Sequence, residues 1–234
     1  MKKTLNKKVI LITGKNGFIG RNLSELILSK YKNYFKIIDY RKKYIRNYTY
    51  DFIIHLAFSH NDNMKKTNIN ITKEVLKLAI RDKSKIIYLS SSSVYGKKSK
   101  NLPIKENFRL NAINNYGRVK IDIENLLRKN ARKHKIHILG LRVFNVVGKY
   151  QNNEFLIPQI INKLKNKEIL EIQNPYHKRD YISADYLSII IMKILFLNKD
   201  HYFKILNLGS GKSYFIYQII NKLVKIYNFN KKNI

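Results

Sequence analysis

The 234-residue chain contains no cysteine, which excludes a disulfide framework and any chemistry that depends on a thiol. Long apolar runs are also missing. The longest one, residues 187–197, is interrupted by Ser188 and Lys193 and is too short to span a bilayer, so we expect a buried helix there. The apolar segment after the basic N-terminus, residues 9–12, is too short for a secretion signal. We therefore expect a cytoplasmic protein without a membrane span.

Acidic residues are scarce: 15 Asp and Glu stand against 47 Lys and Arg, which gives a net charge of +32. Such an excess is typical of nucleic-acid-binding proteins. Here, however, the lysines are spread along the chain, mostly as singles or pairs, and they form no long block of like charge. Lys, Asn, Ile, Tyr and Phe are all heavily used, as A/T-rich codons would produce. We therefore predict no specific nucleic-acid partner, although the charge would attract an anionic substrate.

Three glycines at positions 14, 17 and 20 follow residues 9–12, which have the pattern of a short buried strand. The next residues, 19–27, carry apolar side chains at helical spacing. A strand, a glycine turn and a helix in this order are typical of dinucleotide binding. Gly14 would allow the tight turn, Gly17 would leave room for the pyrophosphate, and Gly20 would let the helix pack closely. The alternative is an ordinary glycine-rich turn.

An acidic residue, Asp39, ends the second predicted strand, residues 35–39, and lies 19 residues after Gly20. At this offset a carboxylate reaches the adenosine ribose and repels a 2′-phosphate, which favours NAD over NADP. Arg41, Lys42 and Lys43 follow directly and leave NADP as the less favoured alternative, because they would shelter a 2′-phosphate. A turn residue at the end of a strand is the other interpretation of Asp39.

Two further apolar segments, residues 51–57 and 85–91, alternate with a helical pattern over residues 70–80. Strands that alternate with helices predict an α/β fold with a doubly wound parallel sheet. Ligands bind beyond the carboxyl ends of the strands in such sheets. The glycine turn, Asp39, residues 56–57 and the serines at 90–93 would therefore lie along one edge.

Tyr116 and Lys120 are four residues apart and share one face of a predicted helix. A free tyrosine has a pKa near ~10 and is a poor base at neutral pH. A lysine ammonium one turn away would favour the phenolate and make proton abstraction from a hydroxyl feasible. In a chain rich in Tyr and Lys, an accidental pair on a helix surface is the alternative.

Taken together, these motifs resemble the NAD-dependent epimerase/dehydratase family, a group of extended short-chain dehydrogenases/reductases that act on sugar nucleotides. The resemblance extends from about residue 8 to about residue 225 and follows the family's order. The matching segments are residues 13–20, 55–57, 70, 90–96, 103–106, 116–120, 141–148, 156–158, 179–182 and 206–211.

The resemblance implies a role for each matching residue. Ser91 would be the catalytic hydroxyl, Tyr116 the acid/base and Lys120 its partner. Arg179 would clamp the nucleotide diphosphate, since a guanidinium suits two phosphate oxygens. The cofactor-binding residues would be Gly14, Asn16, Gly17, Phe18, Ile19, Asp39, Leu56, Ala57, Asn70, Tyr116, Lys120 and Phe144. The substrate-binding residues would be Ser92, Asn145 and Arg179.

Other polar residues receive no functional role. We expect Asp122 and Glu124 to be exposed charges on a helix. His134 and His137 lack a second pair of ligands, so no metal site is predicted.

The resemblance implies a Rossmann-like NAD-binding domain over residues 1–150 and a small, shortened substrate region over residues 151–234. Within the latter, residues 178–200 would pack back on the sheet. Only eleven residues separate Asp39 from Asp51, so one edge of the sheet would also be reduced.

In family members that are dehydratases, Asp and Glu follow the catalytic hydroxyl, whereas this chain has Ser92 and Ser93. We therefore predict an enzyme that epimerises a nucleotide-activated sugar, at C4, with NAD. The alternatives are a 4-ketoreductase that uses NAD(P)H or a dehydratase, and a catalytically impaired binding or partner subunit. The sequence is compatible with a homodimer.

Overall fold

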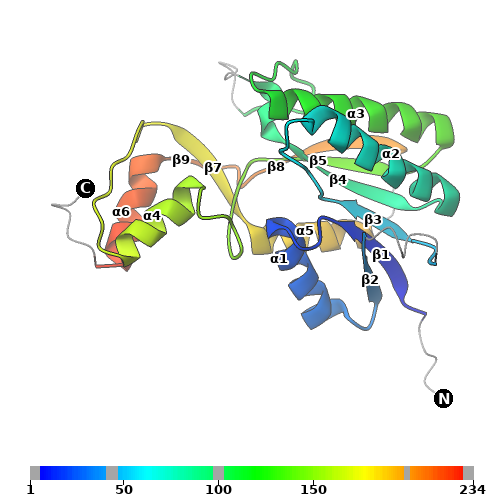
Figure 1. Cartoon of the computed structure of the whole chain (residues 1–234), viewed down its shortest axis with the longest axis horizontal. Helices are drawn as coiled ribbons and strands as arrows, with labels where there is room; N and C mark the ends of the chain where they lie inside the picture. Colours follow the sequence, from blue (N-terminus) through cyan, green and yellow to red (C-terminus); the bar gives the residue numbers. More distant parts are fainter. Residues whose placement is uncertain (1–5, 41–46, 97–102, 198–200, 229–234) are drawn as a thin grey trace.

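The computed structural model describes residues 6–40, 47–96, 103–197 and 201–228. Its centre is a six-stranded sheet in which every neighbouring pair of strands is parallel, with the order β2-β1-β3-β4-β5-β8. This sheet confirms the predicted doubly wound fold (Figure 1). The strands are β1 (Lys8–Thr13), β2 (Phe35–Asp39), β3 (Phe52–His55), β4 (Lys85–Ser91), β5 (Ile138–Val143) and β8 (Phe203–Leu208).

Helices cover both faces of this sheet (Figure 1). Ile10 and Ile12 of β1 belong to the core under α1 and α5, whereas Leu11 between them belongs to the core under α2 and α3. This alternation explains why the strands are apolar throughout, since both faces are buried. We call the six-stranded sheet and these four helices the sheet unit. The helices are α1 (Phe18–Leu26), α2 (Met64–Asp82), α3 (Asn115–His134) and α5 (Ala184–Phe196).

Strand β1 lies between β2 and β3, so the chain direction along the sheet reverses beside it. Ile12 pairs with Asp39 on one side, and Thr13 pairs with His55 on the other. The segments that follow these strands therefore meet at one edge. This reversal is the place where doubly wound sheets bind their ligands.

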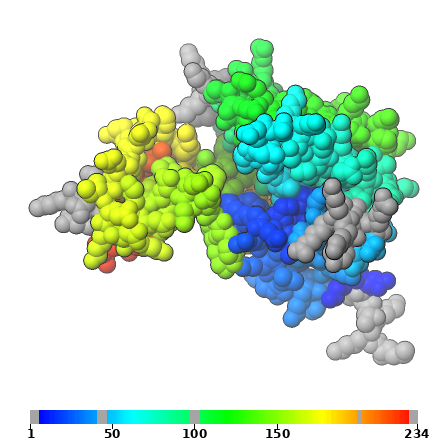
Figure 2. All heavy atoms as spheres, in the orientation of Figure 1, coloured from blue at the N-terminus to red at the C-terminus, as the bar shows by residue number. Residues whose placement is uncertain are grey.

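A second, smaller unit contains a three-stranded sheet with the order β6-β7-β9. Two helices pack together in this unit through a separate apolar core that includes Ile160 and Ile220. In Figure 2 the smaller unit stands as a lobe beside the sheet unit, and the surface is hollowed between them. Its elements are β6 (Asn145–Val147), α4 (Leu156–Lys165), β7 (Lys178–Ser183), β9 (Ser213–Phe215) and α6 (Ile216–Ile226).

The structure differs from the expected division of the chain at three strands. Strand β6 lies within the expected NAD-binding domain but pairs with β7, and β7 lies in the smaller sheet although residues 178–200 were expected to pack on the main one. Residues 203–208 do not belong to the smaller unit, because they form β8 and pair with β5 in the main sheet. Helix α5 also belongs to the sheet unit, where Leu187 and Ile191 are fully buried in the core beneath α1. In the part of the chain that the structure describes, no helix combines the length and apolarity needed to cross a bilayer.

Candidate active site

The glycine turn joins β1 to α1 at the carboxyl edge of the sheet. Gly14 has a positive φ of 71° and lies so close to the β3 end that an added Cβ would be 2.8 Å from the amide nitrogen of Ala57. A Cβ at Gly20 would collide with the carbonyl oxygens of Gly14 and Lys15. Both positions therefore require glycine, one for backbone conformation and both for close packing.

Gly17 has a different environment. It is exposed, and a Cβ there would meet only the carbonyl oxygen of Gly14, at 3.3 Å. Gly17 is also the N-cap of α1, and no side chain caps this helix. Its first N–H groups are thus available for an anion, so the turn fits a pyrophosphate. Asn16, Phe18 and Ile19 lie in the same turn, and the Asn16 carbonyl oxygen accepts a 2.8 Å hydrogen bond from Arg21 Nε.

Residues Leu56 and Ala57 are held against this turn by a buried hydrogen-bonded chain. Both of their N–H groups donate to Thr13 Oγ1 at 3.1 Å. The Thr13 hydroxyl must therefore use its own proton toward His55 Nδ1, 2.8 Å away. His55 Nε2 then carries the other ring proton and donates to Thr72 Oγ1 at 3.1 Å. This chain holds His55 neutral.

His55 is 1% exposed. Burial, and to a smaller extent the positive charge of Lys120, lower its pKa to about 3. His55 therefore acts as a fixed hydrogen-bonding element beneath residues 56–57 and does not titrate near neutral pH.

Two predicted cofactor residues lie in contrasting places. Asp39 ends β2 beside Ile12, two residues from the glycine turn, where a ribose contact is feasible. Asn70 is exposed on α2. Asn68 and Thr72, two residues away on either side, form the buried face of the helix. The basic residues 41–43 lie outside the described residues.

The three predicted catalytic residues lie together. Ser91 ends β4, and its side chain lies close enough to Tyr116 to oppose the increase in the pKa of that phenol. Tyr116 is in the first turn of α3. The residue before this helix, Asn114, is its N-cap, and its side chain accepts a 2.9 Å hydrogen bond from the Gly117 N–H. Lys120, one turn further along, donates a 2.7 Å hydrogen bond to the Leu89 carbonyl oxygen. The cap thus fixes the start of the helix that carries Tyr116, and the bond to β4 fixes the Lys120 side chain.

Aromatic rings enclose this group. Phe58 lies edge-on to Tyr116 with ring centroids 4.9 Å apart, and His60 stacks on Tyr116 at 5.6 Å. Burial raises the pKa of Tyr116, and the Ser91 side chain opposes this increase. Burial also lowers the pKa of Lys120 to about 7, which Glu124 partly opposes. Phe58 and His60 were not predicted, because the matching motif, residues 55–57, ends just before them.

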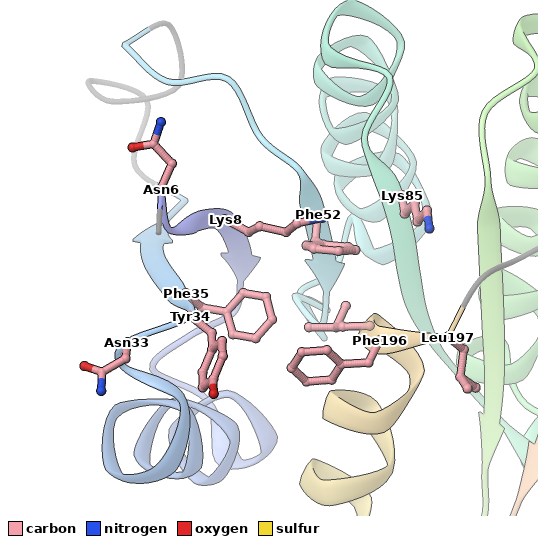
Figure 3. A pocket seen from close by; sticks show the side chains of 10 residues that line it. Asn6, Lys8, Asn33, Tyr34, Phe35, Phe52, Lys85, Phe196 and Leu197 are labelled. Carbon is pink, nitrogen blue, oxygen red and sulfur yellow. The ribbon is translucent and has the colours of Figure 1, made fainter. Parts of the chain in front are cut away.

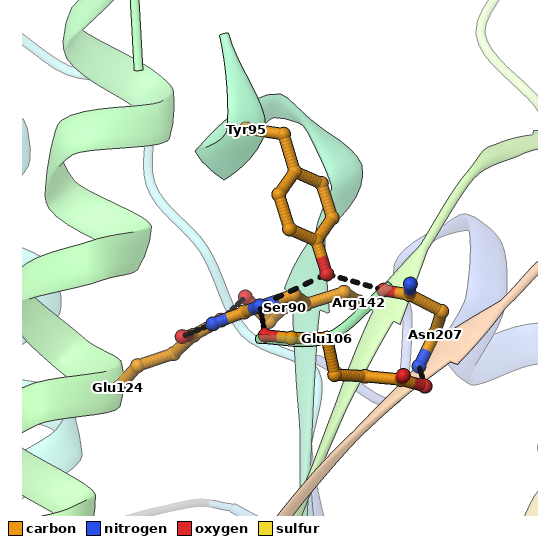
Figure 4. A network of polar contacts seen from close by, with 6 residues as sticks. All are labelled: Ser90, Tyr95, Glu106, Glu124, Arg142 and Asn207. Atoms are coloured by element: carbon orange, nitrogen blue, oxygen red, sulfur yellow. Dashed lines mark hydrogen bonds and ion pairs between the residues drawn. The ribbon is translucent and has the colours of Figure 1, made fainter. Parts of the chain in front are cut away.

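Glu124 corrects one expectation, because it is not an exposed helix charge. It is 1% exposed and forms a buried ion pair with Arg142 of β5, with 2.7 Å between Arg142 Nη2 and Glu124 Oε2. Ser90 donates a further hydrogen bond to Glu124. Figure 4 shows how Arg142 extends this network through Tyr95 to Asn207. The network joins α3, β4, β5 and β8 next to the predicted catalytic residues.

The predicted substrate residues lie at the boundary with the smaller unit. Asn145 donates a 2.9 Å hydrogen bond from its amide to the Asp180 carbonyl oxygen, which joins β6 to β7. Arg179 is exposed on β7. Phe144 is half-buried, and its ring lies against Gly209. Ser92 begins the short 3₁₀ turn after β4, directly beside Ser91.

A separate hollow of about 260 Å³ lies at the opposite edge of the sheet (Figure 3). Its lining includes Lys8, Phe35, Phe52 and Lys85, which are the first residues of four strands. None of the predicted site residues lines it. The hollow is therefore distinct from the candidate site at the carboxyl ends of the same strands.

The model of the "NAD dependent epimerase/dehydratase family" matches residues 10–209, and the chain belongs to this family. A curated relative, GDP-6-deoxy-D-talose 4-dehydrogenase from Aggregatibacter actinomycetemcomitans, is 27% identical over 93% of this chain and 79% of the relative.

Two solved structures share the fold. The dTDP-glucose 4,6-dehydratase of Bacillus anthracis, in complex with NAD, has a TM-score of 0.87 and 20% identity over 97% of this chain and 83% of that one. The UDP-glucose 4-epimerase of Thermotoga maritima, with UDP-glucose, has a TM-score of 0.85 and 21% identity over 95% of this chain and 84% of that one.

Proposed function

We propose that this protein epimerises a nucleotide-activated sugar at C4, with NAD as its resident cofactor. The observation that carries the proposal is the group formed by Ser91, Tyr116 and Lys120. The Ser91 side chain lowers the pKa of Tyr116 against the effect of burial, and Lys120, one helical turn further along α3, has its Nζ 5.7 Å from the Tyr116 ring centroid. This group lies at the same edge of the sheet as the uncapped start of α1, where a dinucleotide fits.

In this proposal each side chain has one task. Tyr116 Oη accepts the proton of the sugar hydroxyl and later returns it, while the Ser91 hydroxyl orients the same oxygen. Lys120 supplies positive charge close to the phenolate. Bound NAD would supply the hydride acceptor in the oxidation and the hydride donor in the reduction.

The residues after Ser91 favour epimerisation over dehydration. Eliminating water from the sugar ring requires an acid and a base beside it. In this chain Ser92 and Ser93 occupy the two positions that hold Asp and Glu in the dehydratases of the family. Ser93 is already engaged with Ser91, with 3.1 Å between their hydroxyl oxygens. A serine hydroxyl does not replace a carboxylic acid in that role, since it does not titrate near neutral pH.

Ketoreduction is the second candidate, because the relative described above is named a 4-dehydrogenase. The two activities differ in their consumption of cofactor. A reductase oxidises one NAD(P)H for each turnover, whereas an epimerase consumes none. The preference for NAD over NADP depends on Asp39 at the end of β2. Calorimetric titration with each dinucleotide tests it, and tighter binding of NADP would reject this role of Asp39.

The decisive experiment incubates the purified protein with UDP-, GDP-, dTDP- and ADP-sugars and identifies the products by mass spectrometry and NMR. We expect an isomer of unchanged mass without net consumption of NAD. Tyr116→Phe should reduce the rate by ~10²–10⁴-fold and retain NAD binding, because it removes the proton carrier and keeps the ring. Tyr186→Phe is the matched control, since Tyr186 is exposed on α5.

Two outcomes would contradict the proposal. Wild-type turnover by Tyr116→Phe would remove Tyr116 from the mechanism. Binding of NAD without conversion of any sugar would support a catalytically impaired partner subunit instead.

A further inference from the structure

Three aromatic rings surround the ammonium group of Lys120. Its Nζ lies 4.5 Å from the ring centroid of Phe58, 4.9 Å from that of Tyr88 and 5.7 Å from that of Tyr116. The side chain also donates to the Leu89 carbonyl oxygen and is 4% exposed. The faces of aromatic rings attract an ammonium group, but they replace its water only in part.

The three rings have different origins. Tyr88 is part of the core between the sheet and α3, and Tyr116 is the proposed acid/base itself. Phe58 comes from the segment after β3 and touches both partners, with its ring 4.5 Å from Lys120 Nζ and 4.9 Å from the Tyr116 ring. Phe58 is only partly buried at the margin of that core, so it is the ring that can be changed with least disturbance of the core and without removing the acid/base.

We propose that Phe58 is a positioning residue, whose ring shields the Lys120 ammonium and one side of Tyr116 from water and so sets the pH range in which this pair works. The inference deepens the proposed function, since it concerns the same proton-transferring pair.

The electrostatic surroundings of Lys120 support this assignment. Charged and titratable groups face it from each neighbouring element: Tyr116 and Glu124 of α3, Tyr88 of β4 and His55 of β3. Burial keeps Tyr88 a neutral phenol, because it raises its pKa well above the ordinary value. His55 is neutral as well, for the reason given above.

Glu124 is the remaining counter-charge, and it is paired with Arg142. Its attraction for the ammonium opposes the effect of burial, yet burial dominates and the pKa of Lys120 is about 7. Water admitted beside Nζ would therefore favour the charged form. The Phe58 ring is one of the groups that keep water away from Lys120 Nζ, and a substitution can remove it.

The test measures the titration of Lys120 directly, in protein labelled with ¹³C and ¹⁵N at lysine. The Lys120→Met variant identifies its NMR signal by loss. We expect one lysine to titrate near neutral pH in the parent, and Phe58→Ala to move this titration upward by about 1–3 pH units. Phe58→Leu keeps an apolar side chain and should remain near the parent, which also covers the case in which the alanine variant fails to fold.

The matched control is Phe215→Ala. Phe215 also lies beside a lysine, with Lys178 Nζ 4.6 Å from its ring centroid, but that lysine is exposed in the smaller unit, so Phe215→Ala should leave the Lys120 titration unchanged. The proposal is overturned if Phe58→Ala folds and leaves the Lys120 titration unchanged, or if Phe58→Leu shifts it as far as alanine does.

A second readout separates this inference from the proposed function. If a sugar nucleotide is converted, the pH–rate profile of Phe58→Ala should move in the same direction as the NMR titration. If no substrate is converted, the NMR result still decides the role of Phe58, and only the proposed function fails. An NMR shift that leaves the pH–rate profile unchanged would reject the role of Phe58 in catalysis.

Discussion

The sheet unit and the smaller unit hold their candidate residues in different ways. In the sheet unit, Lys120 and His55 are buried, and each is fixed by hydrogen bonds that leave little freedom of rotation. In the smaller unit, Arg179 is exposed, and its guanidinium hydrogen-bonds the carbonyl of its own neighbour, Lys178, at 3.2 Å. The groups that support the proposed proton transfer are thus preorganised, whereas the proposed phosphate clamp would form its bonds when the substrate binds.

This difference has an energetic consequence. A buried charge that loses its partner destabilises the fold strongly, whereas an exposed ion pair or hydrogen bond contributes little to stability. Substitutions in the sheet unit should therefore change the free energy of unfolding. Those at Arg179 should change substrate binding and leave the fold intact.

The largest effect is expected for Glu124→Gln. The substitution keeps the shape of the side chain but leaves the buried Arg142 guanidinium without a charged partner, at a cost of about 3–5 kcal/mol in the free energy of unfolding. Denaturant unfolding followed by circular dichroism measures it. Glu168→Gln is the control from the smaller unit, where Glu168 is exposed and accepts a hydrogen bond from Asn166. Equal losses in the free energy of unfolding for Glu124→Gln and Glu168→Gln would contradict the proposed difference between the two units.

An intermediate effect is expected for Arg179→Ala. Hydrogen bonds to a charged group contribute about 1.5–3 kcal/mol, so nucleotide-sugar binding should weaken by roughly 10–150-fold. Binding of NAD and the midpoint of thermal unfolding should stay near the parent values. Isothermal titration with UDP, and with any sugar nucleotide that is converted, measures the loss. Lys165→Ala is the control, because Lys165 is an exposed cation on α4 of the same unit.

A result in which Arg179→Ala binds UDP as tightly as the parent would remove Arg179 from the proposed site. Equal weakening by Lys165→Ala would indicate a general effect of positive charge instead of a specific clamp.

Much of the sheet unit could be predicted from local sequence patterns. The strand at residues 8–13, the glycine turn and the pair of Tyr116 and Lys120 are each specified within a few residues, and the structure has them at one edge of the sheet. Such features depend on short-range periodicity, which a single sequence displays directly.

The features that were missed depend on distant contacts or on helix register. Glu124 follows Lys120 by four residues and shares its buried face, but its partner Arg142 lies 18 residues further on, in a strand. Asn70, predicted from its place in a motif, is exposed on α2, whereas Asn68 and Thr72 lie on the buried face of that helix. The strand β8 was assigned to the wrong unit, because its pairing with β5 joins segments more than 60 residues apart.

The smallest effect, and the sharpest test of burial, concerns His55. Its pKa of about 3 in the folded protein lies below its ordinary value of 6.5, so the unfolded chain binds a proton between these values and the folded protein does not. The free energy of unfolding should therefore fall as the pH falls through this window, by up to about 1.4 kcal/mol per pH unit and by roughly 2 kcal/mol between pH 6.5 and 5.

In His55→Asn this contribution is absent, so the variant should lose less stability over the same interval, whatever its stability at neutral pH. His177→Asn, which changes an exposed histidine of the smaller unit, is the control. Denaturant unfolding at a series of pH values gives the slopes, and the ¹⁵N chemical shifts of His55 report its protonation independently. Parallel stability curves for the parent and His55→Asn, or a His55 ring that is protonated at pH 5, would show that water reaches this histidine and that the two units do not differ as described.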